Sequence, residues 1–391
     1  MRFSNICTLF VLVPYISFYP LGSDIQPLCG FLCLIYIISR FNSLKFSFFD
    51  IIFFLVALFT VINFNRFNNE INFDIFRKHF SLLFAFIIFY YGRIVKNINI
   101  RTFYFSLFIY FFFIAFQVVH PSFYWTIKAM LVNSKYVELG TNRGFSSCAP
   151  EPTDFGFTMF CFLIISTILF KEKRFSKLKI FSSLFIFSSV SASGFISYIV
   201  YLFLNFNRVL RNKYFYIISV PLLIIIFNLD LRPVYILKTL ISDPLFIIGN
   251  TNFSVRFVSF SIGILYFIYD FTNIFGTGVG SCSTIGPQIF EYFNLTENLN
   301  LNSRYASNSL NSLRSGQLSS SFSTLIVEHG VIGVIFLSII FYKIISNKYL
   351  VSKNKVVLVL MFSLYLFQSF PLSYTYPWFI LGLVSNRNII R

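Results

Sequence analysis

Asn142-Arg143-Gly144-Phe145-Ser146-Ser147-Cys148-Ala149-Pro150-Glu151-Pro152-Thr153-Asp154 leads directly into an apolar run that ends at Phe170. This stretch joins a polar connection to a long apolar segment, and it holds one arginine and two carboxylates in a chain that otherwise avoids charge. Proline has no backbone N–H but fits the first position of a helix, so Pro152 predicts a helix start. Glu151 and Asp154 then lie about one turn apart, at the positive end of the helix dipole.

The composition of the whole chain is typical of an integral membrane protein. Hydrophobic residues make up 57% of the 391 and charged residues 12%, and the mean hydropathy is +0.75, far from the values of soluble domains. The 58 Phe and 23 Tyr are spread through every apolar run, which favours lipid-facing positions over carbohydrate stacking. The net charge of +17 is interpreted through membrane topology, so nucleic acid is not an expected partner. We predict an all-α, polytopic fold that contacts membrane lipids.

Apolar runs and basic connections alternate along the first half of the chain. A span needs roughly 20 apolar residues, and fewer where flanking residues reach the interface. Spans are predicted near 6–20, 26–39, 46–64, 79–92, 102–120 and 154–170. Basic residues gather on the cytoplasmic side of membranes. Alternate connections hold them: Arg40 and Lys45; Arg93, Lys96 and Arg101; Lys171, Lys173, Arg174, Lys177 and Lys179. The 142–154 stretch is therefore expected to face outward.

The middle of the chain allows two topologies. Residues 180–206 carry no charge and are interrupted by Ser191-Ala192-Ser193-Gly194, which favours a hairpin with its tip there over one long helix. Residues 229–320 are rich in Asn, Ser and charged side chains, and we predict one large outside loop. Val255 to Phe275 is apolar enough to be a span instead. A topology that inserts this segment and makes 180–206 a single span crosses the membrane the same number of times, so it leaves the rest of the chain on the same sides.

The end of the chain predicts spans at 322–342, 356–370 and 377–384. Lys343, Lys348, Lys353 and Lys355 between the first two are placed inside. The result is one polytopic domain over residues 1–391 with about 12 transmembrane helices and both termini in the cytoplasm.

Familiar nucleotide, hydrolase and metal motifs are missing from the sequence. Cys7, Cys29, Cys33 and Cys161 lie in apolar segments, and no cysteine or histidine spacing is typical of a metal site. We expect no metal and no cofactor. A disulfide between Cys148 and Cys282, which lie in two outside loops, is a minor alternative.

Three polar stretches on the outside could carry chemistry, and each has a simpler explanation. The stretch from Arg143 to Asp154 could be only a helix cap. Arg256 is followed by Gly276-Thr277-Gly278-Val279-Gly280, where backbone N–H groups can approach an anion, although such a run is more often a flexible turn. Glu328-His329-Gly330 and Gly333 lie in an apolar run, where ionisable groups are costly unless they are solvated near the interface.

In this order, the three stretches resemble the O-antigen polymerase family, the Wzy-type membrane glycosyltransferases that also include the O-antigen ligases. The resemblance rests on Arg143 with Glu151-Pro152-Thr153, on Arg256 with Gly276-x-Gly278-x-Gly280, and on Glu328-x-Gly330-x-x-Gly333. It implies an enzyme of the bacterial inner membrane whose site faces the periplasm and whose substrates are polyprenyl-diphosphate-linked glycans. It also implies that residues 229–320 form a periplasmic loop, and that a chain-length regulator is a partner.

In the reaction that this resemblance implies, the departing diphosphate needs cationic donors and the attacking sugar hydroxyl needs a base. Arg143 and Arg256 are the first candidates for the diphosphate, with Arg304 and Arg314 behind them. Glu151 is the first candidate for the base, ahead of Asp154 and His329. We assign Gly276, Gly278, Gly280 and Glu328 to loop positioning.

Two other functions are compatible with a polytopic chain. O-antigen ligases carry a Ser-Arg-Gly at the hairpin tip and a His-Asn before the Glu-x-Gly, whereas this chain has Ser191 to Gly194 without arginine, and Ser319 and Ser320. A flippase for lipid-linked oligosaccharides is the alternative from another class. Flippases usually show two similar halves and mid-membrane charges, which this sequence lacks.

Overall fold

The fold is taken from a computed structural model of the chain. It describes residues 2–16, 26–64, 73–96, 98–132, 145–169, 176–189, 253–270, 273–314, 320–368 and 370–386, with short pieces at 191, 194, 197–199, 201–202, 239 and 242–243. All regular secondary structure within these ranges is helical, as predicted.

The helices of the first half overlap the predicted spans, and α1, α2 and α3 are shorter than predicted. They are α1 (Phe3–Leu12), α2 (Leu28–Ile38), α3 (Phe48–Ile62), α4 (Phe73–His79), α5 (Ser81–Ile94), α6 (Ile100–Val119), α7 (Pro121–Val132), α8 (Pro152–Leu169) and α9 (Ser176–Ser188), with a short 3₁₀ turn at Phe41–Ser43. Pro152 begins α8, which confirms the predicted helix start. The helices α4 and α7 were not predicted, because they lie in segments interpreted as connections.

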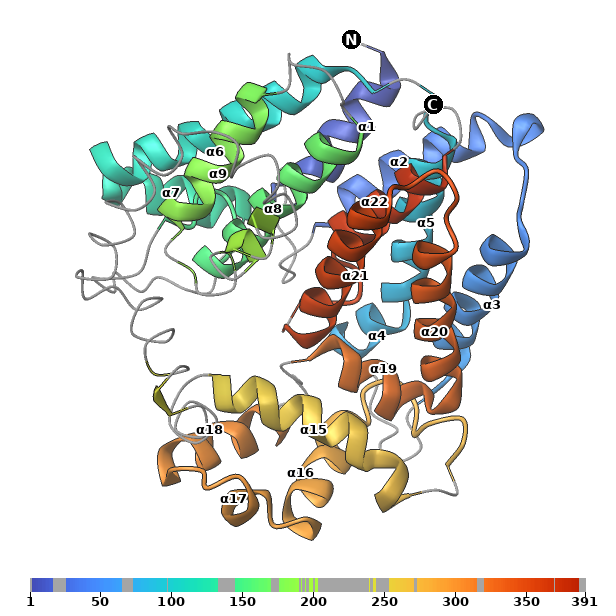
Figure 1. The fold of residues 1–391 in the computed structure, drawn as a ribbon, viewed down its shortest axis with the longest axis vertical. Helices are drawn as coiled ribbons and strands as arrows, with labels where there is room; N and C mark the ends of the chain where they lie inside the picture. The colour runs from blue at the N-terminus through green and yellow to red at the C-terminus, as the bar shows by residue number, and fades with distance from the viewer. Residues whose placement is uncertain are drawn as a thin grey trace.

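The second half contains α15 (Phe253–Tyr269), α16 (Cys282–Tyr292), α17 (Leu295–Asn298), α18 (Ser303–Arg314), α19 (Ser321–His329), α20 (Val331–Ile345), α21 (Ser352–Phe367) and α22 (Thr375–Ser385). Figure 1 shows α15 running across the ends of α20 and α21 rather than alongside them. It packs on α16, α18 and α19. This orientation favours the loop topology over the topology that inserts residues 255–275.

Figure 1 shows three groups of helices: α6 to α9 on one side, α2 to α5 with α20 to α22 on the other, and α15 to α18 across one end. Contacts of α1 with α6 and α22, and of α8 with α21 and α22, join the first two groups. The α2–α3, α5–α6 and α20–α21 connections, which carry basic residues, meet at the end opposite α15. The helix α1 begins and α22 ends at that same end.

One predicted segment differs from the structure, and one of two alternatives for another segment is excluded. The span at 322–342 was wrong in extent: it is divided at Gly330, whose φ of 59° and ψ of −135° end α19 and start α20. A left-handed φ of this kind is open to glycine and costly for other residues. The helix α9 ends at Ser188, which excludes one helix over 180–206, while most of the expected return arm lies outside the described residues.

Apolar side chains lie on the outer surfaces of several helices. On α3, Phe48, Leu55 and Ile62 follow one face at seven-residue spacing, with 80%, 57% and 68% of each residue exposed. Among the described helices, only α6 is both long and apolar enough to cross a membrane, and α1, α2, α3, α5, α8, α15, α20 and α22 are shorter apolar helices. The structure therefore shows the all-α class within the described residues, with one helix that could cross a membrane by length and composition.

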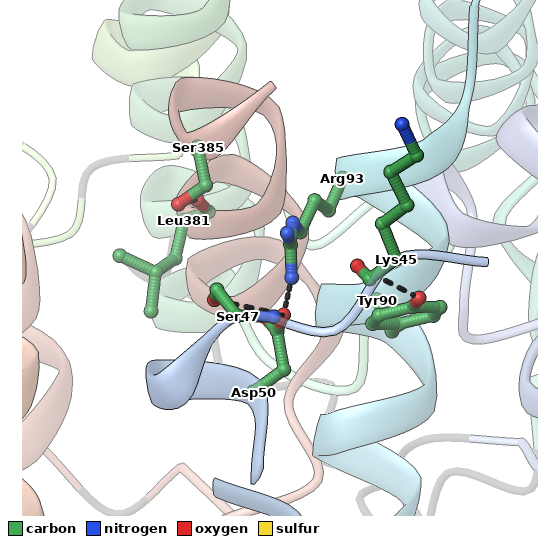
Figure 2. Close-up of polar contacts among 7 residues, drawn as sticks. All are labelled: Lys45, Ser47, Asp50, Tyr90, Arg93, Leu381 and Ser385. Carbon is green, nitrogen blue, oxygen red and sulfur yellow. Dashed lines mark hydrogen bonds and ion pairs between the residues drawn. The ribbon is translucent and has the colours of Figure 1, made fainter. Parts of the chain in front are cut away.

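A buried ion pair joins α3 to α5 near the basic end of the molecule. Figure 2 shows the Arg93 guanidinium and the Ser47 backbone N–H directed at the carboxylate of Asp50. Asp50 is fully buried at the first turn of α3, where it also forms a capping box with Ser47. Arg93 lies in the last turn of α5 and covers the Tyr90 ring. The pair fixes the position of α3 along α5.

Replacing Asp50 by Asn is expected to destabilise the protein by about 3–5 kcal/mol, because it leaves the Arg93 charge without its buried partner. Thermal unfolding of the detergent-purified protein measures the effect. Glu297→Gln removes an exposed carboxylate and serves as the control. Equal unfolding temperatures for Asp50→Asn and the wild type would show that the pair contributes nothing.

Candidate functional site

The glycine run and the Glu328 motif form one structural unit. The Glu328 carboxylate is buried and accepts a hydrogen bond from the Gly280 N–H at 2.8 Å. The Thr277 and Gly278 N–H groups donate to the carbonyls of Val327 and Glu328. Two stretches separated by about 50 residues in the chain are thus bonded along their backbones. This contact agrees with a positioning role for Gly276, Gly278, Gly280 and Glu328.

Glycine is required where the two stretches touch. A Cβ at Gly330 would lie 2.2 Å from the Ile274 carbonyl oxygen, and a Cβ at Gly276 would lie 2.5 Å from the Glu328 carbonyl. The N–H groups of residues 276–281 all donate to protein acceptors. Because no N–H of this run is open, the geometry does not favour direct binding of an anion by the glycine run.

His329 lies on the far side of this unit, against α3. It is fully buried, and its Nε2 lies 3.0 Å from the Thr60 hydroxyl. Asn63, near the end of the same helix, donates to the Glu328 carbonyl at 2.8 Å. Thr60 and Asn63 were not singled out from the sequence, since each is a single polar residue near the end of an apolar run. Through these contacts, α3 holds the glycine run and the Glu328 motif in place.

The two carboxylates at the start of α8, Glu151 and Asp154, differ in their contacts. Asp154 Oδ2 accepts a hydrogen bond from the Glu151 N–H at 3.1 Å, so Asp154 caps the helix. Glu151 is half-buried, and its carboxylate makes no hydrogen bond or ion pair with the residues that the structure describes. Of the two, only Glu151 is left to interact with a ligand.

Buried hydroxyl groups hold the first turns of α8 in place. Tyr374 hydroxyl lies 2.9 Å from the Thr158 hydroxyl and 2.7 Å from the Tyr15 hydroxyl. The Tyr374 hydroxyl also donates to the Asp154 carbonyl at 3.5 Å. These contacts come from α8, from the residues after α1, and from the α21–α22 connection. The position of Glu151 is therefore set by contacts between α8 and two segments distant in the sequence.

The last turn of α21 and the connection that follows it, residues 367–368 and 370–374, touch α8, α15 and α19. Phe370 packs on Phe157 of α8 with ring centroids 4.7 Å apart. The Ser321 N–H, at the start of α19, donates to the Gln368 carbonyl. The last residue of α21, Phe367, packs on Phe253 and Phe260 of α15. We call this meeting point of α8, α15 and α19 the junction.

The predicted arginines differ in their relation to the junction. Arg256 is half-buried and lies on the α15 face between Phe253 and Phe260, since residues three and four apart share one side of a helix. Arg304 and Arg314 are exposed on α18, and Arg314 lies 4.0 Å from Glu291. Arg143 lies outside the described residues. The structure thus brings Arg256 to the junction and leaves Arg304 and Arg314 on an outer surface.

Lys128 is a buried cation that sequence reasoning missed. It is fully buried in α7, and its Nζ donates to the Ser146 hydroxyl at 2.7 Å and to the Tyr124 hydroxyl at 3.1 Å. The Pro150 carbonyl is 3.4 Å away. The signal available in the sequence was a single lysine in an otherwise uncharged stretch, residues 121–132. Lys128 reaches the 142–154 stretch just before Glu151.

The chain matches no known family model, and no curated protein shows significant similarity to it.

Proposed function

We propose that this chain is an O-antigen polymerase, a membrane glycosyltransferase that joins polyprenyl-diphosphate-linked oligosaccharide repeat units on the periplasmic face of the inner membrane. The observation that supports it most is the junction, where α8, α15 and α19 contact the end of α21 and the connection after it. Glu151 immediately precedes α8, Arg256 lies on α15, and Glu328 lies on α19. Motifs that act on one substrate have to lie near one another, and the contacts that these three helices share with α21 support such an arrangement.

The surface of the helices supports the membrane part of the proposal. Exposed apolar residues follow single faces of α3 and α6, such as Phe105, Phe108 and Phe112 on α6. Apolar surface of this extent is unfavourable in water and favourable in lipid. The basic connections lie at one end, as the bias of Lys and Arg toward the cytoplasm requires, and the junction lies toward the other end.

The proposed reaction breaks the bond between the growing glycan and its diphosphate and forms a glycosidic bond to a hydroxyl of the next repeat unit. The hydroxyl proton passes to a base, and the polyprenyl diphosphate leaves with its negative charge. Arg256 and Arg143 would hold the diphosphate, because the guanidinium group donates two parallel hydrogen bonds to phosphate oxygens. The N-terminus of α8 adds a favourable dipole for an anion.

Glu151 is the base that the geometry favours. A base has to reach the hydroxyl whose proton it accepts. Asp154 is engaged in capping α8, and His329 is fully buried against Thr60. The Glu151 carboxylate is half-exposed and makes no hydrogen bond or ion pair with the described residues. We therefore keep Glu151 and assign Asp154 and His329 to structural roles.

Replacing Arg256 by Ala is expected to lower polymerisation by about 10²-fold, because the departing diphosphate loses a cationic donor. Plasmids carrying each variant are introduced into a strain that lacks the gene, and the lipopolysaccharide ladder is examined on a gel. Arg314→Ala, which removes an exposed arginine of the same loop, is the matched control and should leave the ladder unchanged. A full-length ladder from Arg256→Ala would exclude Arg256 from the mechanism.

A further inference from the structure

Lys128 has the features of a group that holds a reactive segment in place. Its side chain is completely buried, and its three N–H bonds are matched by three neutral acceptors, the Ser146 and Tyr124 hydroxyls and the Pro150 carbonyl. The Trp125 ring covers it, with Nζ 5.1 Å from the ring centroid. Burying an ammonium group without a contacting carboxylate is costly, which indicates that the charge has a role at this position.

The segment that Lys128 holds is the one that leads into Glu151. Ser147 has a φ of 53°, an uncommon conformation for a residue with a side chain. The Tyr124 hydroxyl donates to the Ser147 carbonyl at 2.7 Å, and the Ser147 hydroxyl donates to the Tyr110 carbonyl at 2.6 Å. Lys128 binds both ends of the segment, Ser146 and Pro150. The turn is therefore fixed from α6 and α7 at once.

We propose that Lys128 is a positioning residue whose buried ammonium group holds residues 146–150 so that Glu151 stands in reach of the acceptor hydroxyl. The inference rests on the proposed function, because it assigns Glu151 as the base of that reaction. Lys128 itself is fully buried, so it acts through the segment and does not touch the substrate. Misplacement of a reacting group by about 1 Å is enough to slow a reaction by about 10²-fold.

Because Lys128 can lose its charge as the pH rises, the proposal predicts that the reaction rate depends on pH. Burial lowers the pKa of Lys128 to about 8, and nearby Cys148, Asp154 and Glu151 oppose the shift. These groups and Tyr124 are the titratable groups that face it among the described residues. The pKa of Lys128 is lower in the folded protein than in the unfolded chain, so the buried ammonium group lowers the free energy of unfolding by its full amount below pH 8. This destabilisation disappears as the pH rises from about 8 to about 10.4, the ordinary pKa of lysine. Above pH 8, the segment loses the charge and one donor.

The test uses the purified full-length protein, with Lys128→Met and the control Lys348→Met, which removes an exposed lysine. Polymer formation from a lipid-linked repeat unit is measured from pH 6.5 to 9.5, together with thermal unfolding. The wild type is expected to lose rate above pH 8. Lys128→Met should be slower by about ten- to a hundredfold at pH 7, without that further loss. Its unfolding temperature should not fall, because a buried charge is removed.

Maleimide labelling of Cys148 provides a readout that does not depend on activity. This thiol is buried within the segment, and the same measurement on Cys148→Ser subtracts the other free cysteines. Faster labelling in Lys128→Met supports the proposal, and equal labelling rates or a wild-type pH profile in the variant overturn it. If the wild type forms no polymer but labelling is faster in the variant, the proposed function fails, and Lys128 still holds the segment.

Discussion

Glu151→Gln is expected to lower the rate of polymerisation by about 10²- to 10⁴-fold, the usual contribution of a general base. Glutamine has nearly the same shape as glutamate, and the Glu151 N–H can still donate to Asp154, so the start of α8 should be unchanged. The amide has no negative charge and cannot accept the proton of the acceptor hydroxyl. The rate is measured with the purified protein and a lipid-linked repeat unit.

Asp154→Asn separates the base from the cap. Asn is also a good acceptor for helix N–H groups, so this variant should retain most of the rate while losing a carboxylate at the same helix end. If Asp154→Asn abolished polymerisation and Glu151→Gln did not, the two roles would have to be exchanged. Normal rates in both variants would remove the α8 carboxylates from the mechanism.

Gly330→Ala is expected to prevent correct folding or to cost about 3 kcal/mol or more, the largest stability effect that we predict. The new Cβ would lie 2.2 Å from the Ile274 carbonyl oxygen and 2.4 Å from the Gly276 nitrogen, both of which are backbone atoms. The alanine would also have to adopt a φ of 59°. Yield and thermal unfolding of the full-length protein measure the effect.

Gly280→Ala is the matched control for the steric contact. Gly280 also has a positive φ, of 85°, but a Cβ there would meet only the Ile75 side chain at 3.4 Å or more. This variant should cost about 1 kcal/mol, the price of the backbone conformation alone. Equal losses for Gly330→Ala and Gly280→Ala would show that close contact between the two stretches is not what requires glycine.

Much of the fold was predictable because apolar runs and helix signals agree. Pro152 after a polar stretch predicted the start of α8, and the apolar run at 102–120 predicted α6. The division at Gly330 was not predicted, because the apolar pattern continues through it and only the backbone geometry shows the turn. The helix α7 was missed because a 12-residue segment gives a weak signal next to spans of roughly 20 residues.

The stretches that form the candidate site could be predicted from the sequence, but the contacts between them could not. The spacing of the glycines and of Glu328 marked two unusual stretches, yet hydrogen bonding between them depends on how α3, α16 and α19 pack. The capping role of Asp154 followed from its position in the first turn. Lys128 could not be placed at the site, because its contact with Ser146 joins two segments across residues 133–144.

Deletion of the gene tests most directly whether the chain polymerises lipid-linked repeat units. The lipopolysaccharide of the deletion strain is separated on a gel beside that of the parent and of the strain complemented with the wild-type gene. We predict that the deletion strain makes lipid A-core carrying a single repeat unit, and that complementation restores the ladder. Complete absence of O-antigen would contradict the account in favour of a flippase or a ligase, and an unchanged ladder would contradict it altogether.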